Sequence, residues 1–178
     1  MPVTLSAGAN KSKHSARWGA STPRPVPGAP LASPRVSQST PAFSPPVVAA
    51  MVVHEPGDWF AETLHALAGQ DYPALQHLFL LNGAPDDPRL QPARDLIATV
   101  LPDAAVRHTG ANAGYAAACN AVLSLVEGEG GLFCFMHDDV ALAPDAVSRM
   151  VEELHRSNAG VVGPKLVHWD DPRMIQGV

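Results

Sequence analysis

Apolar runs alternate along the chain with segments in which apolar residues recur at helical spacing. Residues 47–53 are a continuous apolar run, which is typical of a strand buried on both faces of a sheet. Further strands are predicted at residues 75–81, 104–108, 132–136, 160–162 and 165–168. Helices are predicted at residues 58–69, 92–101, 114–127 and 145–157. This alternation predicts an α/β domain with a mostly parallel sheet covered by helices on both faces.

The first 45 residues lack this periodicity. They contain 8 of the 18 prolines and many serines, with five basic residues and no acidic one. Such a segment cannot bury enough apolar surface to offset the entropy lost on ordering. We therefore expect residues 1–45 to be a disordered tail and residues 46–178 to form one domain. The basic tail loosely resembles a transit peptide, but no amphipathic helix is visible in it, which favours a plain flexible tail.

The rest of the chain is acidic, with 7 basic and 17 acidic residues. An acidic surface repels phosphates, so no nucleic-acid partner is expected, and an anionic ligand would be met through a metal ion instead. Cys119 and Cys134 lack metal-ligand spacing and are predicted to be reduced core residues, which favours a reducing compartment. The apolar runs are shorter than the ~18 residues of a membrane-spanning helix, so we expect a soluble segment.

Polar residues follow several of the predicted strands. In open parallel sheets, ligands bind at the carboxyl ends of the strands. This rule selects four loops, which contain His54-Glu55, Asn82 with Asp86 and Asp87, residues 109–114, and His137-Asp138-Asp139. We expect the four loops to meet at one edge of the sheet.

Asp138 and Asp139 directly follow the predicted strand 132–136. Two adjacent carboxylates repel each other unless a cation or hydrogen-bond donors neutralise them. A hard divalent ion with oxygen ligands, Mg²⁺ or Mn²⁺, can bridge such carboxylates to a diphosphate. The same dipeptide also serves as a helix-capping pair or as solvated loop acids, and the residues alone leave these interpretations open.

The run Asn112-Ala113-Gly114-Tyr115 begins a predicted helix, where free N–H groups and the helix dipole favour an anion. Asn and Gly also begin helices for local reasons, so this signal is weak on its own. Asn120 is a polar residue on a helix that otherwise looks buried. It must find a partner, which is either the backbone of a neighbouring loop or a ligand.

Taken together, these segments resemble family 2 glycosyltransferases, the inverting GT-A enzymes that use nucleotide-sugar donors. The resemblance covers about 130 residues. Its segments are 47–55, 63–73 with the sequence TLHALAGQDYP, 112–120 with NAGYAAACN, 135–140 with the position of the family's acidic triplet, 160–165, and 175–177.

The resemblance implies a GT-A-like, Rossmann-type sheet that is incomplete at the carboxyl terminus of this chain. It implies that His54, Glu55 and Asn82 contact the nucleotide, that Asn112, Gly114, Asn120 and Asp138 complete its site, and that Asp139 with Asp138 binds Mn²⁺ or Mg²⁺. The ion would stabilise the leaving nucleoside diphosphate while an acceptor hydroxyl attacks with inversion. The general base is expected beyond Val178, so no catalytic residue is assigned and the 178 residues alone are expected to be inactive.

Three positions depart from the family pattern. Asn82 replaces an Asp that usually recognises the base, Glu55 replaces a frequent Asn, and His137 replaces the first acid of the triplet. One alternative is therefore a non-catalytic or degenerate nucleotide-sugar-binding module. Another is a nucleotidyltransferase-like enzyme, which would need a Gly-rich basic loop that residues 54–58 lack.

The resemblance also implies partners and a location. It implies a hexosyltransferase of cell-wall or polysaccharide biosynthesis, with a carbohydrate or lipid-linked acceptor. The expected location is cytoplasmic, with the inner face of the plasma membrane as the alternative for a longer protein, whose membrane association would come from regions outside this sequence.

Overall fold

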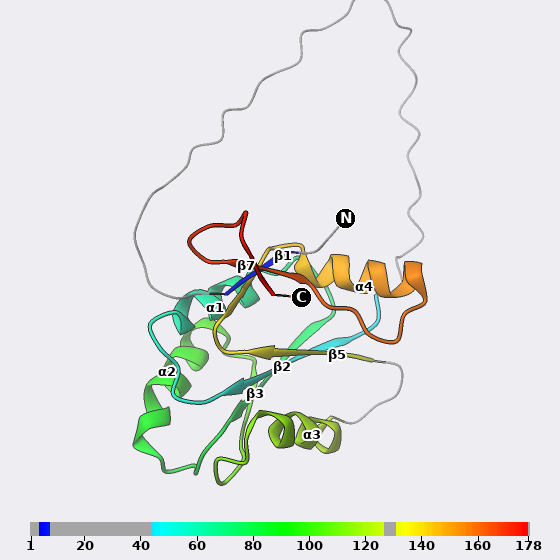
Figure 1. Cartoon of the computed structure of the whole chain (residues 1–178). Helices are drawn as coiled ribbons and strands as arrows, with labels where there is room; N and C mark the ends of the chain where they lie inside the picture. Colours follow the sequence, from blue (N-terminus) through cyan, green and yellow to red (C-terminus); the bar gives the residue numbers. More distant parts are fainter. Residues whose placement is uncertain (1–3, 8–43, 127–130, 178) are drawn as a thin grey trace, which may run out of the picture.

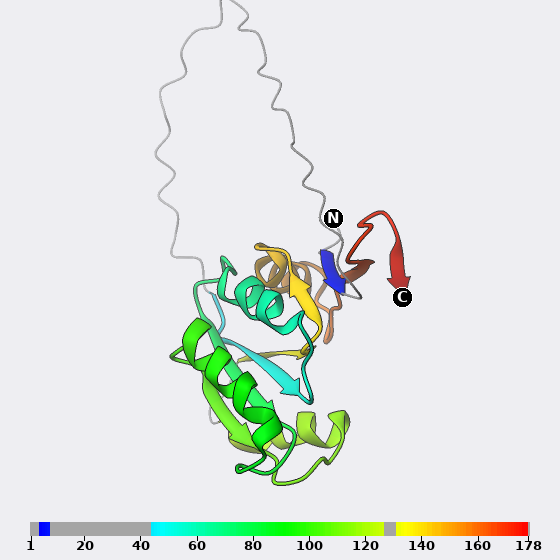
Figure 2. The same cartoon turned by 90° about the vertical axis from the view of Figure 1, so that its left-hand side faces the viewer.

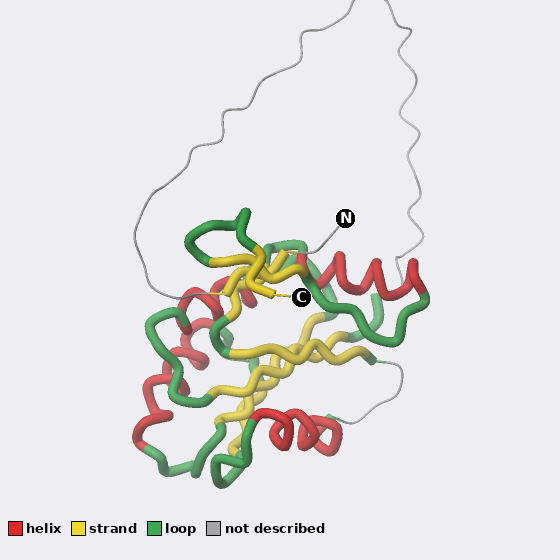
Figure 3. The backbone as a smooth tube through the Cα atoms, viewed as in Figure 1, coloured by secondary structure: helices red, strands yellow, loops and turns green. Residues whose placement is uncertain are grey.

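The central sheet consists of four parallel strands in the order β4-β3-β2-β5 (Figures 1 and 3). These strands are β2 (Val47–Val53), β3 (Leu75–Leu81), β4 (Ala105–His108) and β5 (Leu132–His137). The computed structural model describes residues 4–7, 44–126 and 131–177. Val53 is in register with Leu81, and Val52 with His137, so the carboxyl ends of these strands lie at one edge. The predicted parallel sheet is confirmed.

Helices cover both faces of this sheet, as Figures 1 and 2 show. Met51 and Val53 of β2 face the cluster that contains α1 (Phe60–Ala68), α2 (Gln91–Val100) and α4 (Ala146–Ser157). Ala50 and Val52, which point the opposite way, pack against α3 (Tyr115–Leu125). A short 3₁₀ turn, η1 (Pro88–Leu90), precedes α2. Each β2 side chain is thereby buried, which explains the continuous apolar run.

Helix α1 presents Phe60, Leu64 and Leu67 to the core at the spacing that the sequence predicts. It begins one residue after Trp59, and no side chain caps its amino terminus. The same buried face carries Thr63, whose hydroxyl has no hydrogen-bond partner among the described residues. A buried hydroxyl without a partner costs about 1–3 kcal/mol.

We therefore expect Thr63→Val to raise the free energy of unfolding by about 1 kcal/mol, because valine has the same shape and no polar atom to desolvate. Urea denaturation measures this change. Thr99→Val is the matched control, since the Thr99 hydroxyl is exposed and donates to Asp95 O at 2.7 Å. A lower stability for Thr63→Val than for the wild type would contradict the absence of a partner.

A second sheet has the order β6-β1-β7-β8 and combines short strands from distant parts of the chain. Its strands are β1 (Thr4–Ala7), β6 (Val140–Leu142), β7 (Lys165–His168) and β8 (Ile175–Gly177). Strand β1 lies antiparallel to β6 and parallel to β7. Residues 4–7 of the expected tail thus form a strand through long-range backbone pairing, which local apolar periodicity does not reveal. Residues 8–43 of that expected tail lie outside the described residues.

Gln70 fixes the start of α4 and with it the segment that follows the carboxylate pair. Its side-chain N–H donates to Ala143 O at 2.8 Å, and its Oε1 accepts from Val147 N at 3.1 Å. Next to it, Asp71 N–H donates to Pro144 O, and the Ser148 hydroxyl donates to Asp71. The conformation of residues 138–145 is thus held from both ends, by β5 and by this turn.

Some details differ from the sequence-based expectations. Residues 160–162 are irregular, because no strand pairs with them in the described part of the chain, and Val161 is exposed. Phe133 is 39% exposed and Trp59 is also partly exposed, although both are large apolar residues. The outer edge of β5 has no partner strand among the described residues. None of the described helices combines the length and the hydropathy needed to cross a membrane.

Candidate functional site

The loops that follow β2 and β5 are joined directly at the carboxyl edge of the sheet. The backbone N–H of His54 donates to Asp138 Oδ2 at 3.0 Å. Because β2 and β5 are neighbours, this hydrogen bond fixes the first residue after one strand against the first acid after the other. Asp138 and His54 therefore belong to one site, as the sequence predicts from their strand-end positions.

Asn82, the first residue after β3, lies beneath this edge. It is 4% exposed, and its side-chain N–H₂ donates to Asn112 Oδ1 at 2.8 Å. Its Oδ1 accepts from the Thr109 hydroxyl and from Ala113 N, both at 3.1 Å. Buried polar groups need such partners. Asn82 thus uses its side chain to hold the loop 109–114 in place.

Asn112 connects this loop to β2. Its Nδ2 lies 3.1 Å from His54 Nε2, and its Oδ1 also accepts from Gly114 N at 3.1 Å. Gly114 has φ 80 and ψ 162, a conformation that only glycine adopts readily. It precedes α3, whose amino terminus has no side-chain cap. The first N–H groups of α3 therefore begin beside Asn112 and remain suited to an anion.

The carboxylate pair is partly removed from water. Burial raises the pKa of Asp138 above its ordinary value, and the charge of Asp139 acts in the same direction. The hydrogen bond from His54 N–H partly offsets both effects. A nearby cation would favour the ionised form of both carboxylates.

His137 packs against the start of α3. Its ring stacks on Tyr115 with the ring centroids 4.0 Å apart and the planes 7° from parallel. Tyr115 directly follows Gly114, and His137 directly precedes Asp138. The stacked pair therefore fixes the carboxylates relative to the amino terminus of α3, and His137 is held by packing.

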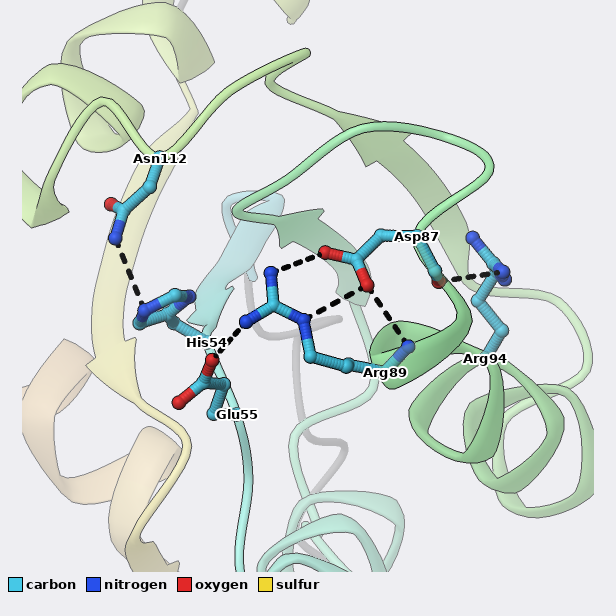
Figure 4. Close-up of polar contacts among 6 residues, drawn as sticks. All are labelled: His54, Glu55, Asp87, Arg89, Arg94 and Asn112. Atoms are coloured by element: carbon cyan, nitrogen blue, oxygen red, sulfur yellow. Dashed lines mark hydrogen bonds and ion pairs between the residues drawn. The ribbon is translucent and has the colours of Figure 1, made fainter.

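Glu55, Asp87 and Arg89 form an ion-paired cluster at the same edge, here called the Arg89 cluster (Figure 4). The Arg89 guanidinium donates to Asp87 through Nε at 3.1 Å and Nη2 at 2.8 Å. Its Nη1 donates to Glu55 Oε1 at 2.7 Å. The hydrogen bonds to Asp87 and the charges of both acids raise the pKa of Arg89. Sequence reasoning placed Asp86 and Asp87 in one of the four strand-end loops but did not single out Arg89.

Glu55 is one of two described non-glycine residues with a positive φ, at 51°, and the other is Asn158 at 52°. Asn158 ends α4 in the left-handed conformation that asparagine tolerates. Glutamate has no such tolerance, and the conformation costs about 1–2 kcal/mol.

We expect Glu55→Asn to raise the free energy of unfolding by roughly 0.5 kcal/mol, because relief of the left-handed strain exceeds the loss of an exposed ion pair. Chemical denaturation measures it. The reverse exchange, Asn158→Glu, should lower stability, which provides the matched control. Equal losses for both variants would show that Glu55 is not strained.

Asn120 lies elsewhere on the surface of α3. It is exposed, and its side chain makes no hydrogen bond within the described part of the chain. The expectation that its helix is buried all round is wrong. Only Ala118 and Val122 are buried, because α3 contacts the sheet along a single face. The predicted contact of Asn120 with a nucleotide stays a prediction.

A large apolar hollow lies away from these polar residues. Its volume is about 520 Å³, and it lies between the open edge of β5, the apolar face of α4 and residues 160–164. None of the charged or amide side chains at the strand ends lines it. Polar contacts, rather than cavity size, therefore locate the candidate site.

The carboxylate pair fits a divalent ion whose remaining ligands come from a substrate and from water. Within residues 4–7, 44–126 and 131–177, no group of three or more His, Cys, Asp or Glu side chains is arranged to hold a metal. Mg²⁺ commonly binds through one or two carboxylates, with phosphate oxygens and water completing its shell. Asp138 and Asp139 are two adjacent carboxylates of this kind, and the uncapped start of α3 lies nearby.

Comparison with known proteins gives a family and a fold. The family model described as glycosyl transferase family 2 matches residues 49–174. Among solved structures, the crystal structure of S. aureus TarS is similar, with a TM-score of 0.50 and 18% identity over 64% of this chain. The chain spans 20% of the TarS chain. No curated protein matches it. The α/β, GT-A-like fold class is confirmed.

Proposed function

The chain belongs to glycosyl transferase family 2, and from this we propose that its strand-end edge binds a nucleotide-diphosphate sugar. In a complete enzyme of this family, this donor would pass its sugar to the hydroxyl of a carbohydrate or lipid-linked acceptor. The proposal assigns no general base among the 178 residues, so the chain alone is expected to bind the donor without turnover.

One observation carries the proposal. A continuous set of hydrogen bonds runs from Asp138 through His54 and Asn112 to Asn82, and so connects the loops after β5, β2, β4 and β3. Carboxylates and an uncapped helix start are thereby held at one edge. This arrangement offers two oxygen ligands for a divalent ion and N–H donors for phosphate within the same site.

Different residues of the chain would bind the metal ion, the diphosphate and the nucleoside. Asp138 and Asp139 would hold Mn²⁺ or Mg²⁺, which supplies positive charge to the leaving diphosphate. Asn112 and Gly114 orient the start of α3, whose N–H groups donate to phosphate oxygens. His54 fixes Asp138 through its backbone and Asn112 through its ring. The loops after β2 and β3 receive the nucleoside.

Calorimetry tests this proposal on the whole 178-residue chain. Uridine, guanosine, adenosine and thymidine diphosphates are titrated with Mn²⁺ and then with a chelator in excess. We expect weak binding of at least one of them that depends on Mn²⁺. Absence of binding by all four, or identical binding with the chelator, would overturn the proposal.

A further inference from the structure

Asn82 stands where the family usually has an Asp that recognises the base, but its side chain is already hydrogen-bonded within the protein. Asn82 is buried, and both ends of its amide are engaged by Asn112, Thr109 and Ala113. Its amide oxygen already accepts two hydrogen bonds and its N–H₂ already donates one, so few hydrogen-bonding groups remain for a ligand. Recognition of the nucleoside must then come from exposed polar groups on the loops after β2 and β3.

Arg89 is such a group, with 66% of its side chain exposed. Although it is exposed, its guanidinium is hydrogen-bonded to two carboxylates on two different loops, and these contacts favour one conformation of the side chain. Asp87 comes from the loop after β3, and Glu55 from the loop after β2, next to His54 (Figure 4). A fixed donor costs less entropy on binding than a mobile one.

The chain contains a second Asp-Pro-Arg unit that separates local from tertiary effects. In Asp171-Pro172-Arg173, the Arg173 N–H, Nε and Nη2 donate to the aspartate as they do in Asp87-Pro88-Arg89. The Arg–Asp fork is therefore a local turn feature that needs no ligand site. What distinguishes Arg89 is a third guanidinium contact, to a second carboxylate that Glu55 supplies from 34 residues earlier in the chain.

Stability does not explain that third contact. An exposed ion pair adds little to stability, whereas the left-handed backbone conformation is unfavourable for a glutamate such as Glu55. The contact between Glu55 and Arg89 therefore does not compensate for the backbone strain at Glu55. Strained residues of this kind are concentrated at binding and active sites.

The charge of the Arg89 cluster selects the part of the ligand that it suits. Its one guanidinium lies between two carboxylates, and the Arg94 guanidinium beside Asp87 only balances the remaining negative charge, so the cluster does not attract a diphosphate. Of the five guanidinium N–H groups, three donate to Asp87 and Glu55, which leaves two donors and the flat faces of the group. The two free N–H groups suit carbonyl or hydroxyl acceptors, and the flat faces suit a stacked ring. An uncharged nucleoside has both features.

We infer that Arg89, held between Asp87 and Glu55, contacts the nucleoside end of the donor and contributes to the choice of nucleotide. This inference rests on the proposed function. It assigns opposite ends of one ligand to two groups of residues. The Arg89 cluster receives the uncharged nucleoside, and Asp138 with Asp139 receives the diphosphate.

The test compares Arg89→Ala with Arg173→Ala in the whole chain. Both variants remove an exposed arginine from an Asp-Pro-Arg unit, so their local effects match. Calorimetry with Mn²⁺ measures the affinity of each variant for the four nucleoside diphosphates and for inorganic pyrophosphate. We expect Arg89→Ala to lower the affinity for the tightest-binding nucleoside diphosphate roughly tenfold. The differences in affinity among the four nucleoside diphosphates should also become smaller. Its pyrophosphate affinity, and all affinities of Arg173→Ala, should remain those of the wild type.

A second variant separates contact from folding. Glu55→Asn keeps the left-handed backbone and is expected to be more stable, but it removes the carboxylate that binds Arg89. It should therefore also lower the affinity for nucleoside diphosphates and leave the affinity for pyrophosphate unchanged. Unchanged nucleoside diphosphate affinity in Arg89→Ala, or an equal loss for pyrophosphate, would overturn the inference and leave the proposed function standing. A wild-type chain that binds none of the four would overturn both.

Discussion

Replacing Asp139 with alanine is expected to reduce Mn²⁺-dependent binding of a nucleoside diphosphate by at least about 100-fold. Loss of groups that only support metal ligands costs about 10–100-fold, so loss of a ligand itself should cost no less. Asp138 Oδ2 already accepts the His54 N–H, whereas Asp139 accepts no hydrogen bond from the described residues. The Asp139 carboxylate is therefore the freer oxygen donor of the pair.

Asp170→Ala is the matched control for this prediction. Asp170 is an exposed acid in another Asp-Asp pair, and its removal changes the net charge of the chain equally. Calorimetry should give wild-type affinity for Asp170→Ala. Similar losses in the two variants would mean that overall charge, rather than a metal ligand, controls binding. Thermal unfolding of both variants by circular dichroism shows whether each remains folded.

Replacing Phe79 with alanine is expected to lower the free energy of unfolding by about 3–5 kcal/mol. Phe79 is 0% exposed and lies on β3, in the middle of the cluster between the sheet and helices α1 and α2. Truncation of a buried phenylalanine removes apolar contacts and leaves a cavity that the surrounding strands cannot fill by relaxing.

Phe133→Ala makes the same chemical change at an exposed position. Phe133 is 39% exposed and stacks on Phe135 of the same strand, with centroids 5.8 Å apart. Its loss should cost less than about 1 kcal/mol. Urea denaturation compares the two variants. Equal losses would show that the face of β5 on the side of α3 is covered in the folded protein.

Much of the fold follows from local pattern. The apolar run at 47–53 identifies β2 because a central parallel strand must be apolar on both faces. The spacing of Phe60, Leu64 and Leu67 identifies α1 because one face of a short helix meets the sheet. Once parallel strands are recognised, the position of the candidate site follows, since all carboxyl ends lie at one edge.

Other features depend on contacts between distant residues. Nothing local in Thr4–Ala7 encodes its pairing with β6 and β7, which are more than 130 residues away. The burial of Asn82 follows from the loop that closes over it, and the apolar character of Phe133 does not reveal that its side chain is 39% exposed in the fold. Arg89 looks like any turn residue in sequence, because only the folded chain brings Glu55 to it.

The central claim is that a divalent ion and a nucleoside diphosphate meet at the carboxyl edge of the sheet, and paramagnetic NMR with Mn²⁺ tests it most directly. Strand β2 has 7 residues, so its amino end lies about 20 Å from that edge. With a nucleoside diphosphate present, Mn²⁺ should broaden the amide signals of His54, Ala113 and Asp139 and spare those of Val47 and Gly131. Broadening centred on Val47 and Gly131, or none at the strand ends, would contradict the claim.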